Sequence, residues 1–248
     1  MFDAFMGAKD DLGVTDLAKK LDLHKNNVFR LLATLETRGY VEQNKLTGNY
    51  RLGYKTFELG QAFLHQAGLL KQARPVMDEL VKACNETVYV GVLRGDFVIY
   101  LDIAETTHSV RVANRVGTLL PAYATAIGKA QLAYLSEDEL ARIFTKPKMQ
   151  AYTDKTITDR DKLYAHLREV AKKGYAMDLE ELEQDVFCVG VPVLDYTGRA
   201  VAGLCVSAPG CRMGRKRMEG ELMPLVKAAG AEVSRALGYT QEAEKAAG

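Results

Sequence analysis

The sequence has few of the residues from which metal and redox sites are built. It contains four histidines and four cysteines in 248 residues. Cys84, Cys188, Cys205 and Cys211 are scattered, with no Cys-x-x-Cys pair and no nearby His-x-x-x-His. This spacing argues against structural zinc. Cys84, Cys188 and Cys205 lie in apolar runs, which predicts buried free thiols.

The signatures of common enzymes are missing as well. There is no Gly-x-Ser-x-Gly elbow and no glycine-rich phosphate loop. One enzymatic alternative would use Ser207 or Cys188 as nucleophile and His108 or His166 as base, but no pairing motif connects these residues. We therefore expect no catalytic residue, no metal and no cofactor.

No run of 18 apolar residues and no signal-peptide pattern is present. We expect no association with a membrane, and the cytoplasm as the compartment. The hydrophobic fraction of 48% and the charged fraction of 26% are ordinary for a globular protein. A chain of this length suits one large domain or two modest ones.

The most informative segment spans residues 14–41. Its pattern predicts a helix over 16–21 with Thr15 as N-cap, a tight turn at 22–24, and a second helix over 25–38 that is closed by Gly39. The second helix has an apolar face at helical spacing and polar residues near its start. The expected apolar face consists of Val28, Leu31, Leu32 and Leu35, and the polar residues are Lys25, Asn26, Asn27 and Arg30.

A hairpin is expected directly after this pair of helices. Residues 40–43 and 49–52 alternate as strands around the polar, glycine-containing tip 44–48. A helix-turn-helix followed by a hairpin is a winged helix. Although the net charge of the chain is only +1, residues 19–55 hold eight Lys or Arg against three acidic residues. Such a local positive excess favours nucleic-acid binding.

The remainder of the chain reads as a linker followed by a second domain. Residues 54–70 predict an amphipathic helix that links the domains and pairs with its copy in a dimer, with an ordinary surface helix as the alternative. A separate helix is expected over 75–84. Strands that pair with their sequence neighbours, with helices outside them, indicate an α+β fold with an antiparallel sheet. The apolar face of the linker helix comprises Phe57, Leu59, Phe63, Leu64, Leu69 and Leu70. The expected strands are 87–93, 97–103, 110–112, 187–194 and 201–207, and further helices are expected over 124–135, 158–173 and 214–237. Another helix is expected to open with a capping box at Ser136-Glu-Asp-Glu139.

Several motifs in a fixed order make the chain resemble the IclR-type bacterial transcription regulators over about residues 1–238. These motifs are Arg30-Leu-Leu-Ala-Thr-Leu35 with Gly39-Tyr40, Thr47-Gly-Asn-Tyr-Arg-Leu-Gly53, Pro121-Ala-Tyr-Ala-Thr-Ala-Ile-Gly-Lys-Ala130, Gly174-Tyr-Ala-Met-Asp178, Val191-Pro-Val-Leu-Asp-Tyr-Thr-Gly198 and Val206-Ser-Ala-Pro209.

The resemblance implies a winged helix-turn-helix over 1–53, a linker and dimerisation helix over 54–70, a GAF-like effector-binding domain over 71–238 and a flexible tail over 239–248. It implies a dimer or tetramer that binds a palindromic operator. Within that frame we expect Lys25, Asn26, Asn27 and Arg30 to contact bases or phosphates in the major groove. Thr15, Lys45 and Arg51 would contact the DNA backbone. A merely solvated helix face is the alternative for Lys25 and Arg30.

The resemblance also places a small organic-acid effector, aromatic or short and aliphatic, between the helix that starts near Thr125 and the final hairpin. Carried over to this chain, the lining falls on Ala126, Ile127, Asp178, Cys188, Cys205 and Ser207, to which we add Leu119 and Leu120. Many relatives have His in place of Tyr123 and Gly in place of Ala126, so we expect a narrow site. An ionised Asp178 would repel a carboxylate ligand, so this pairing is unfavourable unless Asp178 is protonated or water bridges the two groups. Asp178 could instead bond a ligand hydroxyl, and the two cysteines could serve only core packing.

These observations predict a ligand-responsive DNA-binding regulator. The alternatives are a sensory or scaffold protein whose winged helix binds protein, and an enzyme that uses the C-terminal pocket. The sequence leaves open the effector, the operator, repression or activation, and dimer or tetramer.

Overall fold

The computed structural model describes residues 1–6, 8, 10–66 and 68–240. The chain divides into two compact units, residues 1–67 and 68–248. The expected tail over 239–248 lies outside the described residues from 241 onward. Among the described residues, no helix is long and apolar enough to cross a membrane.

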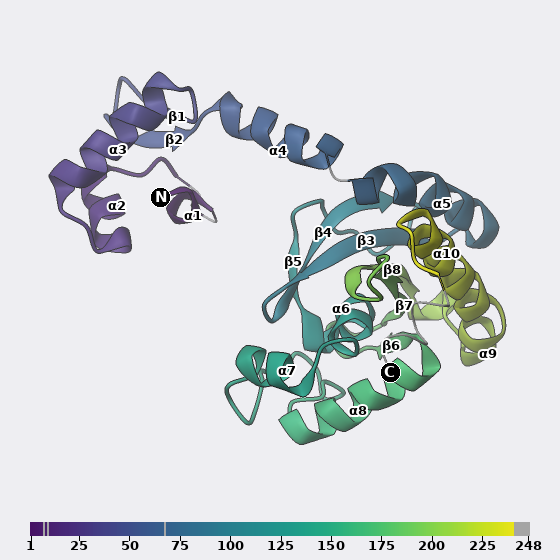
Figure 1. The fold of residues 1–248 in the computed structure, drawn as a ribbon. Coiled ribbons are helices and arrows are strands. Elements are labelled where there is room, and N and C mark those ends of the chain that lie inside the picture. The colour runs from purple at the N-terminus through teal and green to yellow at the C-terminus, as the bar shows by residue number, and fades with distance from the viewer. Residues whose placement is uncertain (7, 9, 67, 241–248) are drawn as a thin grey trace. The chain divides into compact units, whose positions relative to one another are not determined.

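The first unit is a winged helix-turn-helix (Figure 1). Its core is a small cluster that contains Leu17, Val28, Leu32, Val41 and Tyr50. The two strands pair antiparallel with Val41 opposite Leu52, which confirms the predicted hairpin. The elements are α1 (Phe2–Phe5), α2 (Val14–Leu21), α3 (Lys25–Thr37), β1 (Val41–Gln43), β2 (Tyr50–Leu52) and α4 (Tyr54–Gln66).

Two expectations for this unit were wrong in detail. The N-cap of α2 is Gly13, and Thr15 lies inside the helix. Leu31 is 45% exposed instead of buried, because the small core covers only the stripe of α3 that contains Val28 and Leu32. The described residues of the predicted linker helix are helical, with 54–66 in α4 and 68–70 in the next helix of the chain. The side chains of Phe63 and Leu64 lie outside the described part of the chain.

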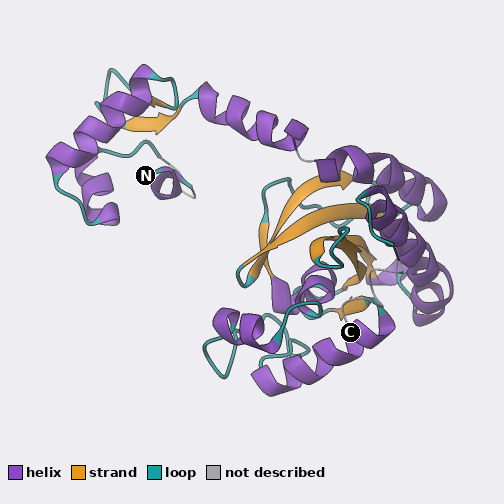
Figure 2. Cartoon of the chain, in the orientation of Figure 1, coloured by secondary structure: helices purple, strands orange, loops and turns teal. Residues whose placement is uncertain are grey.

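The second unit is built on a six-stranded antiparallel sheet in the order β5-β4-β3-β8-β7-β6. Its strands are orange in Figure 2. This arrangement confirms the predicted α+β class. The central hairpin pairs β7 with β8 over almost its whole length. The strands are β3 (Thr87–Arg94), β4 (Phe97–Ala104), β5 (Leu119–Pro121), β6 (Ala176–Leu179), β7 (Val186–Leu194) and β8 (Ala200–Pro209).

Helices cover both faces of this sheet (Figure 1). The helices α5 (Gly68–Cys84) and α10 (Met223–Ala236) pack on one face, where they meet valine and leucine side chains of the central strands. The opposite face is covered by α6 (Ala126–Leu132), α7 (Glu137–Ile143) and α8 (Arg160–Lys173). Because side chains alternate between the faces of a strand, β3 sends Val88 and Val90 to the first face and Tyr89 to the second.

The structure also corrects the expectations for this unit. Pro75 lies inside α5 instead of starting a helix, although it removes one donor from the helix ladder. The stripe of Ala73, Met77 and Leu80 is buried on both sides of this proline, and this packing sustains the helix. Residues 110–112 form no strand, whereas the short edge strands β5 and β6 escaped prediction. The last predicted helix is divided by a π-helical segment over Met218–Leu222.

Candidate functional site

The start of α3 presents polar side chains to solvent. Lys25, Asn26, Asn27 and Arg30 are all exposed, while Val28 on the same helix is fully buried. With 3.6 residues per turn, one stripe of the helix anchors it to the core and the other faces remain free. This is the geometry required of a helix that enters the major groove.

The three other predicted DNA contacts are also on the surface. Thr15 is exposed on α2, and Lys45 is exposed in the turn of the hairpin. The turn is held by Asn44 Oδ1, which accepts the backbone N–H of Leu46 at 3.0 Å. Arg51 forms an exposed ion pair with Glu42 at 3.2 Å, so its charge is partly offset in this structure.

Sequence reasoning missed two apolar side chains on this surface. Phe29 on α3 is 55% exposed, and Leu46 at the hairpin tip is 97% exposed. Phe29 directly precedes Arg30, and Leu46 follows Lys45. Their position beside exposed cations was the available signal, since apolar residues can contact thymine methyl groups or enter a groove.

In the second unit, strand register brings a row of polar side chains together. Asp178 on β6 is paired with Cys188 on β7, and Cys188 is paired with Ser207 on β8. The row continues to Thr87 on β3. Directly opposed residues of antiparallel strands point to the same face, so these four side chains share the face that α6 covers. The Cys188 thiol and the Ser207 hydroxyl are hydrogen-bonded at 2.8 Å.

Glycines allow α6 to approach this face closely. A Cβ at Gly190 would lie 2.7 Å from the carbonyl carbon of Ala126, and one at Gly203 would lie 2.7 Å from Ile127 Cγ1. The helix begins at its N-cap Thr125, whose hydroxyl accepts the Gly128 N–H at 3.2 Å. The first turn of α6 is therefore held against the sheet beside the polar row.

A cavity of about 70 Å³ lies between this turn and the polar row. It contains seven of the eight side chains predicted for the effector site; Leu119 does not line it and is 45% exposed. The lining also includes residues that the sequence did not indicate, several of them from the irregular segment 105–118 and the segment after β6. The predicted residues are Leu120, Ala126, Ile127, Asp178, Cys188, Cys205 and Ser207, and the additional ones are Tyr100, Val112, Asn114, Thr125, Leu182, Glu183 and Val186.

The two thiols of the cavity wall are neutral. Burial raises the pKa of the Cys188 thiol well above its usual value and that of Cys205 to about 12, so both remain protonated. Burial also raises the pKa of Asp178 to about 7. Asp178 Oδ1 accepts the backbone N–H of Glu181 at 2.7 Å, which orients this carboxyl group.

An ion pair lies close behind the cavity. Lys129 of α6 is fully buried and donates to Glu181, which follows β6. Thr156 donates to the Glu181 carbonyl at 2.6 Å and so helps to hold the segment after β6. The pair thus ties the helix that forms one wall of the cavity to the segment that contributes Leu182 and Glu183 to it.

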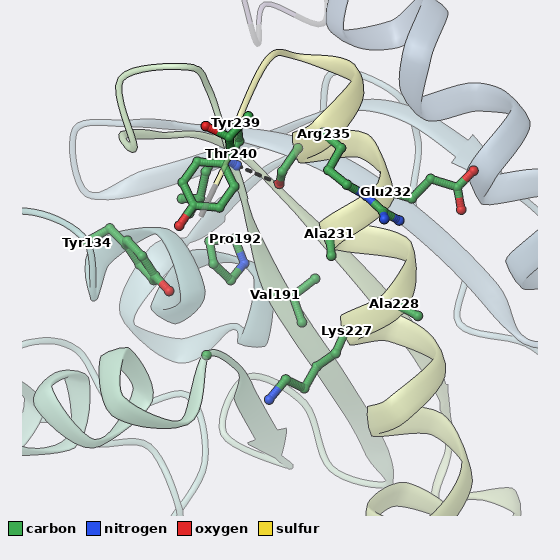
Figure 3. A pocket seen from close by; sticks show the side chains of 13 residues that line it. Tyr134, Val191, Pro192, Lys227, Ala228, Ala231, Glu232, Arg235, Tyr239 and Thr240 are labelled. Atoms are coloured by element: carbon green, nitrogen blue, oxygen red, sulfur yellow. Dashed lines mark hydrogen bonds between the residues drawn. The ribbon is translucent and has the colours of Figure 1, made fainter. Parts of the chain in front are cut away.

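A wider groove of about 880 Å³ lies elsewhere on this unit, beside α10 and the outer part of β7 (Figure 3). Lys227 and Tyr134 point into it, and Lys227 donates to the carbonyl of Lys173 at 3.0 Å. None of the predicted effector residues lines this groove. The smaller and less open cavity, which the predicted residues line, is therefore the candidate effector site.

A winged helix-turn-helix together with a helix-covered antiparallel sheet defines a class of transcription regulators with a separate ligand-binding domain. Two family models match the chain: the IclR helix-turn-helix domain over residues 1–45 and the bacterial transcriptional regulator IclR C-terminal domain over residues 61–235. The chain belongs to the IclR family of bacterial transcriptional regulators.

Individual relatives agree with this assignment. The chain is 34% identical over 234 residues to the HTH-type transcriptional regulator KdgR of Escherichia coli, covering 94% of this chain and 89% of KdgR. It is 35% identical over 218 residues to BhcR of Paracoccus denitrificans, covering 88% and 78% of the two chains. The crystal structure of Thermotoga maritima IclR superimposes with a TM-score of 0.71 at 31% identity, covering 96% and 95%. These curated relatives are named as transcriptional regulators and not as enzymes.

Proposed function

We propose that this protein binds a palindromic operator as a dimer or tetramer and that a small organic acid switches this binding. The observation that carries the DNA part is the exposed start of α3, where Lys25, Asn26, Asn27 and Arg30 face solvent above a buried apolar stripe. Asn can bond adenine with two hydrogen bonds, and Arg and Lys can bond guanine or phosphate. Thr15, Lys45 and Arg51 set the register on the DNA backbone.

Arg30→Ala tests this part. We expect the variant to lose about 1–3 kcal/mol of binding free energy toward an operator selected from random duplex DNA. Arg38→Ala is the matched control, because Arg38 is exposed at the C-terminal end of the same helix. Fluorescence anisotropy measures both affinities. Equal affinities for wild type and Arg30→Ala would favour the alternative in which the winged helix binds protein.

The effector part is supported by the small cavity beside α6. Its mixture of apolar walls with a few hydroxyl, amide and carboxyl groups suits a small acid with an apolar body. Pockets for drug-sized ligands have volumes of roughly 300–1,000 Å³. A cavity of about 70 Å³ therefore favours a short acid, or an aromatic acid that widens it on entry. The side chains of Ala126 and Ile127 narrow the cavity along one wall.

A thermal-shift screen with pyruvate, lactate and 4-hydroxybenzoate tests this part. The last is bound by an IclR homologue of Microbacterium hydrocarbonoxydans that shares the fold. An acid at 100 times its Kd should stabilise the folded state by about 2.7 kcal/mol. The shift should vanish in Ala126→Phe, which fills the cavity, and persist in Ala228→Phe, which changes the groove beside α10. A shift that persists in Ala126→Phe and vanishes in Ala228→Phe would place the effector site in the groove.

A further inference from the structure

We infer that a carboxylate effector enters the cavity together with one proton, which is shared between the effector and Asp178, so that effector affinity falls as the pH rises. The inference rests on the proposed function, since it concerns the same site. It adds a chemical condition for binding and a regulation by pH.

The first argument is the composition of the cavity. Among the described residues that line it there is no Lys, Arg or His, but the carboxyl groups of Asp178 and Glu183 are present. Asp178 is 2% exposed, whereas Glu183 lies at the surface. An entering carboxylate therefore meets a buried carboxyl group and no cation on the wall. Two carboxylates in a shared low-dielectric site cannot both remain ionised, and one proton between them relieves the repulsion.

The second argument is that the nearby positive charge already has a partner. Lys129 is the cation that acts on Asp178, but it is fully buried and already paired with Glu181. Its charge is therefore largely offset before an effector enters. The titratable and charged groups that face Asp178 are Lys129 from α6, Tyr100 from β4, Glu181 and Glu183 from the segment after β6, Cys188 from β7 and Cys205 from β8.

The start of α6 does not supply the missing positive charge. This helix has only seven residues, and the hydroxyl of its N-cap Thr125 accepts the Gly128 N–H, so the remaining N–H groups of the first turn add partial positive charge but no cation. The Cys188 and Ser207 side chains are hydrogen-bonded to each other. A protonated Asp178 is thus the strongest donor that the wall can offer to a carboxylate.

The proton is available near neutrality. Burial raises the pKa of Asp178 to about 7, so both protonation states are populated in the free protein. Only the protonated state accepts the carboxylate. Above pH 7 each further unit lowers the competent fraction about tenfold.

Calorimetric titration of the full chain with pyruvate, lactate and 4-hydroxybenzoate at pH 6 and pH 8 tests the inference. We expect binding about tenfold weaker at pH 8, and an uptake approaching one proton at pH 8 when buffers of different ionisation enthalpy are compared. Lactamide serves as an uncharged probe whose affinity should not fall over this range. Asp178→Asn should bind the acid with no pH dependence, because its amide donates at every pH. Asp161→Asn on α8 is the matched control and should keep the wild-type dependence, because its side chain is 90% exposed and does not line the cavity.

The outcomes separate the two proposals. Acid binding of equal strength at both pH values, without proton uptake, would overturn the shared proton and leave the effector site intact. Binding to none of the three acids at either pH would overturn the organic-acid effector itself. If Asp178→Asn does not fold, the proton count on the wild-type protein decides alone.

Discussion

At the scale of single residues, burial shapes the titration of this protein more than local sequence does. His166 on α8 is an example: burial, followed by the charges of Lys129 and Lys173, lowers its pKa to about 4. Its Nε2 atom has no hydrogen-bond partner among the described residues. The neutral imidazole is therefore the form that the fold accommodates.

This residue predicts a contribution to acid unfolding. Because the pKa of His166 is lower in the folded state, its neutral form contributes stability above pH 6.5 that is lost as the pH falls toward 4. We expect His166→Phe to lose less stability than wild type between pH 6.5 and 4 in urea unfolding. His24→Gln, at the exposed turn before α3, is the control. Parallel curves for wild type and His166→Phe would contradict this reasoning.

At the scale of elements, the cavity depends on how closely α6 packs on the sheet. Because Gly190 and Gly203 have no side chain, the first turn of that helix can lie directly against the two strands. A Cβ at either position would meet backbone atoms of the helix, so no side-chain rotation could relieve the clash. Thr125 and Gly128 then set where the helix begins. The wall of the cavity is thus a product of two strands and one helix terminus.

Gly190→Ala should disturb this contact. The added Cβ would lie 2.7 Å from the carbonyl carbon of Ala126, so α6 must move away from β7. We expect a loss of about 1–3 kcal/mol of unfolding free energy, as for overpacked cores, and weaker acid binding. Gly220→Ala, with no atom within 4 Å of the added Cβ, is the control. Urea unfolding and calorimetry give the two quantities, and an unchanged acid affinity would show that the helix position does not define the site.

At the scale of the whole molecule, effector and operator must influence each other equally if they bind to different units. Allosteric coupling is a free energy between sites and is therefore reciprocal. The two compact units, 1–67 and 68–248, carry the two proposed sites separately. A coupling of this kind requires two states with different affinities for each ligand.

This reciprocity can be measured directly. If a saturating acid lowers the affinity for the selected operator by some factor, saturating operator should lower the affinity for the acid by the same factor, typically 5–150-fold. Anisotropy and calorimetry provide the two values on the full chain. Asp178→Asn should remove the pH dependence of the acid's effect on operator binding, while its operator affinity without acid should match wild type. Two unequal factors would mean that DNA and acid do not share one linked equilibrium.

Local sequence alone determined the features that arise within a few residues. The capping box of Ser136 and Glu139 was predicted and is present, because both of its hydrogen bonds join residues three positions apart. The polar start and buried stripe of α3 follow from helical periodicity in the same way. Cys84, Cys188 and Cys205 are buried and form no disulfide, as their apolar surroundings in the sequence predicted.

Only the tertiary structure decided what lies between elements distant in the chain. It exposed Leu31, because a small domain has core for one stripe of α3 only. It placed Leu120 in the cavity and Leu119 outside it, because neighbouring residues of a strand point to opposite faces. The alignment of Asp178 with Cys188 and Ser207 depends on strand register, and the burial of Lys129 against Glu181 depends on packing. Periodicity predicts which face of an element is buried, but not which partner will cover it.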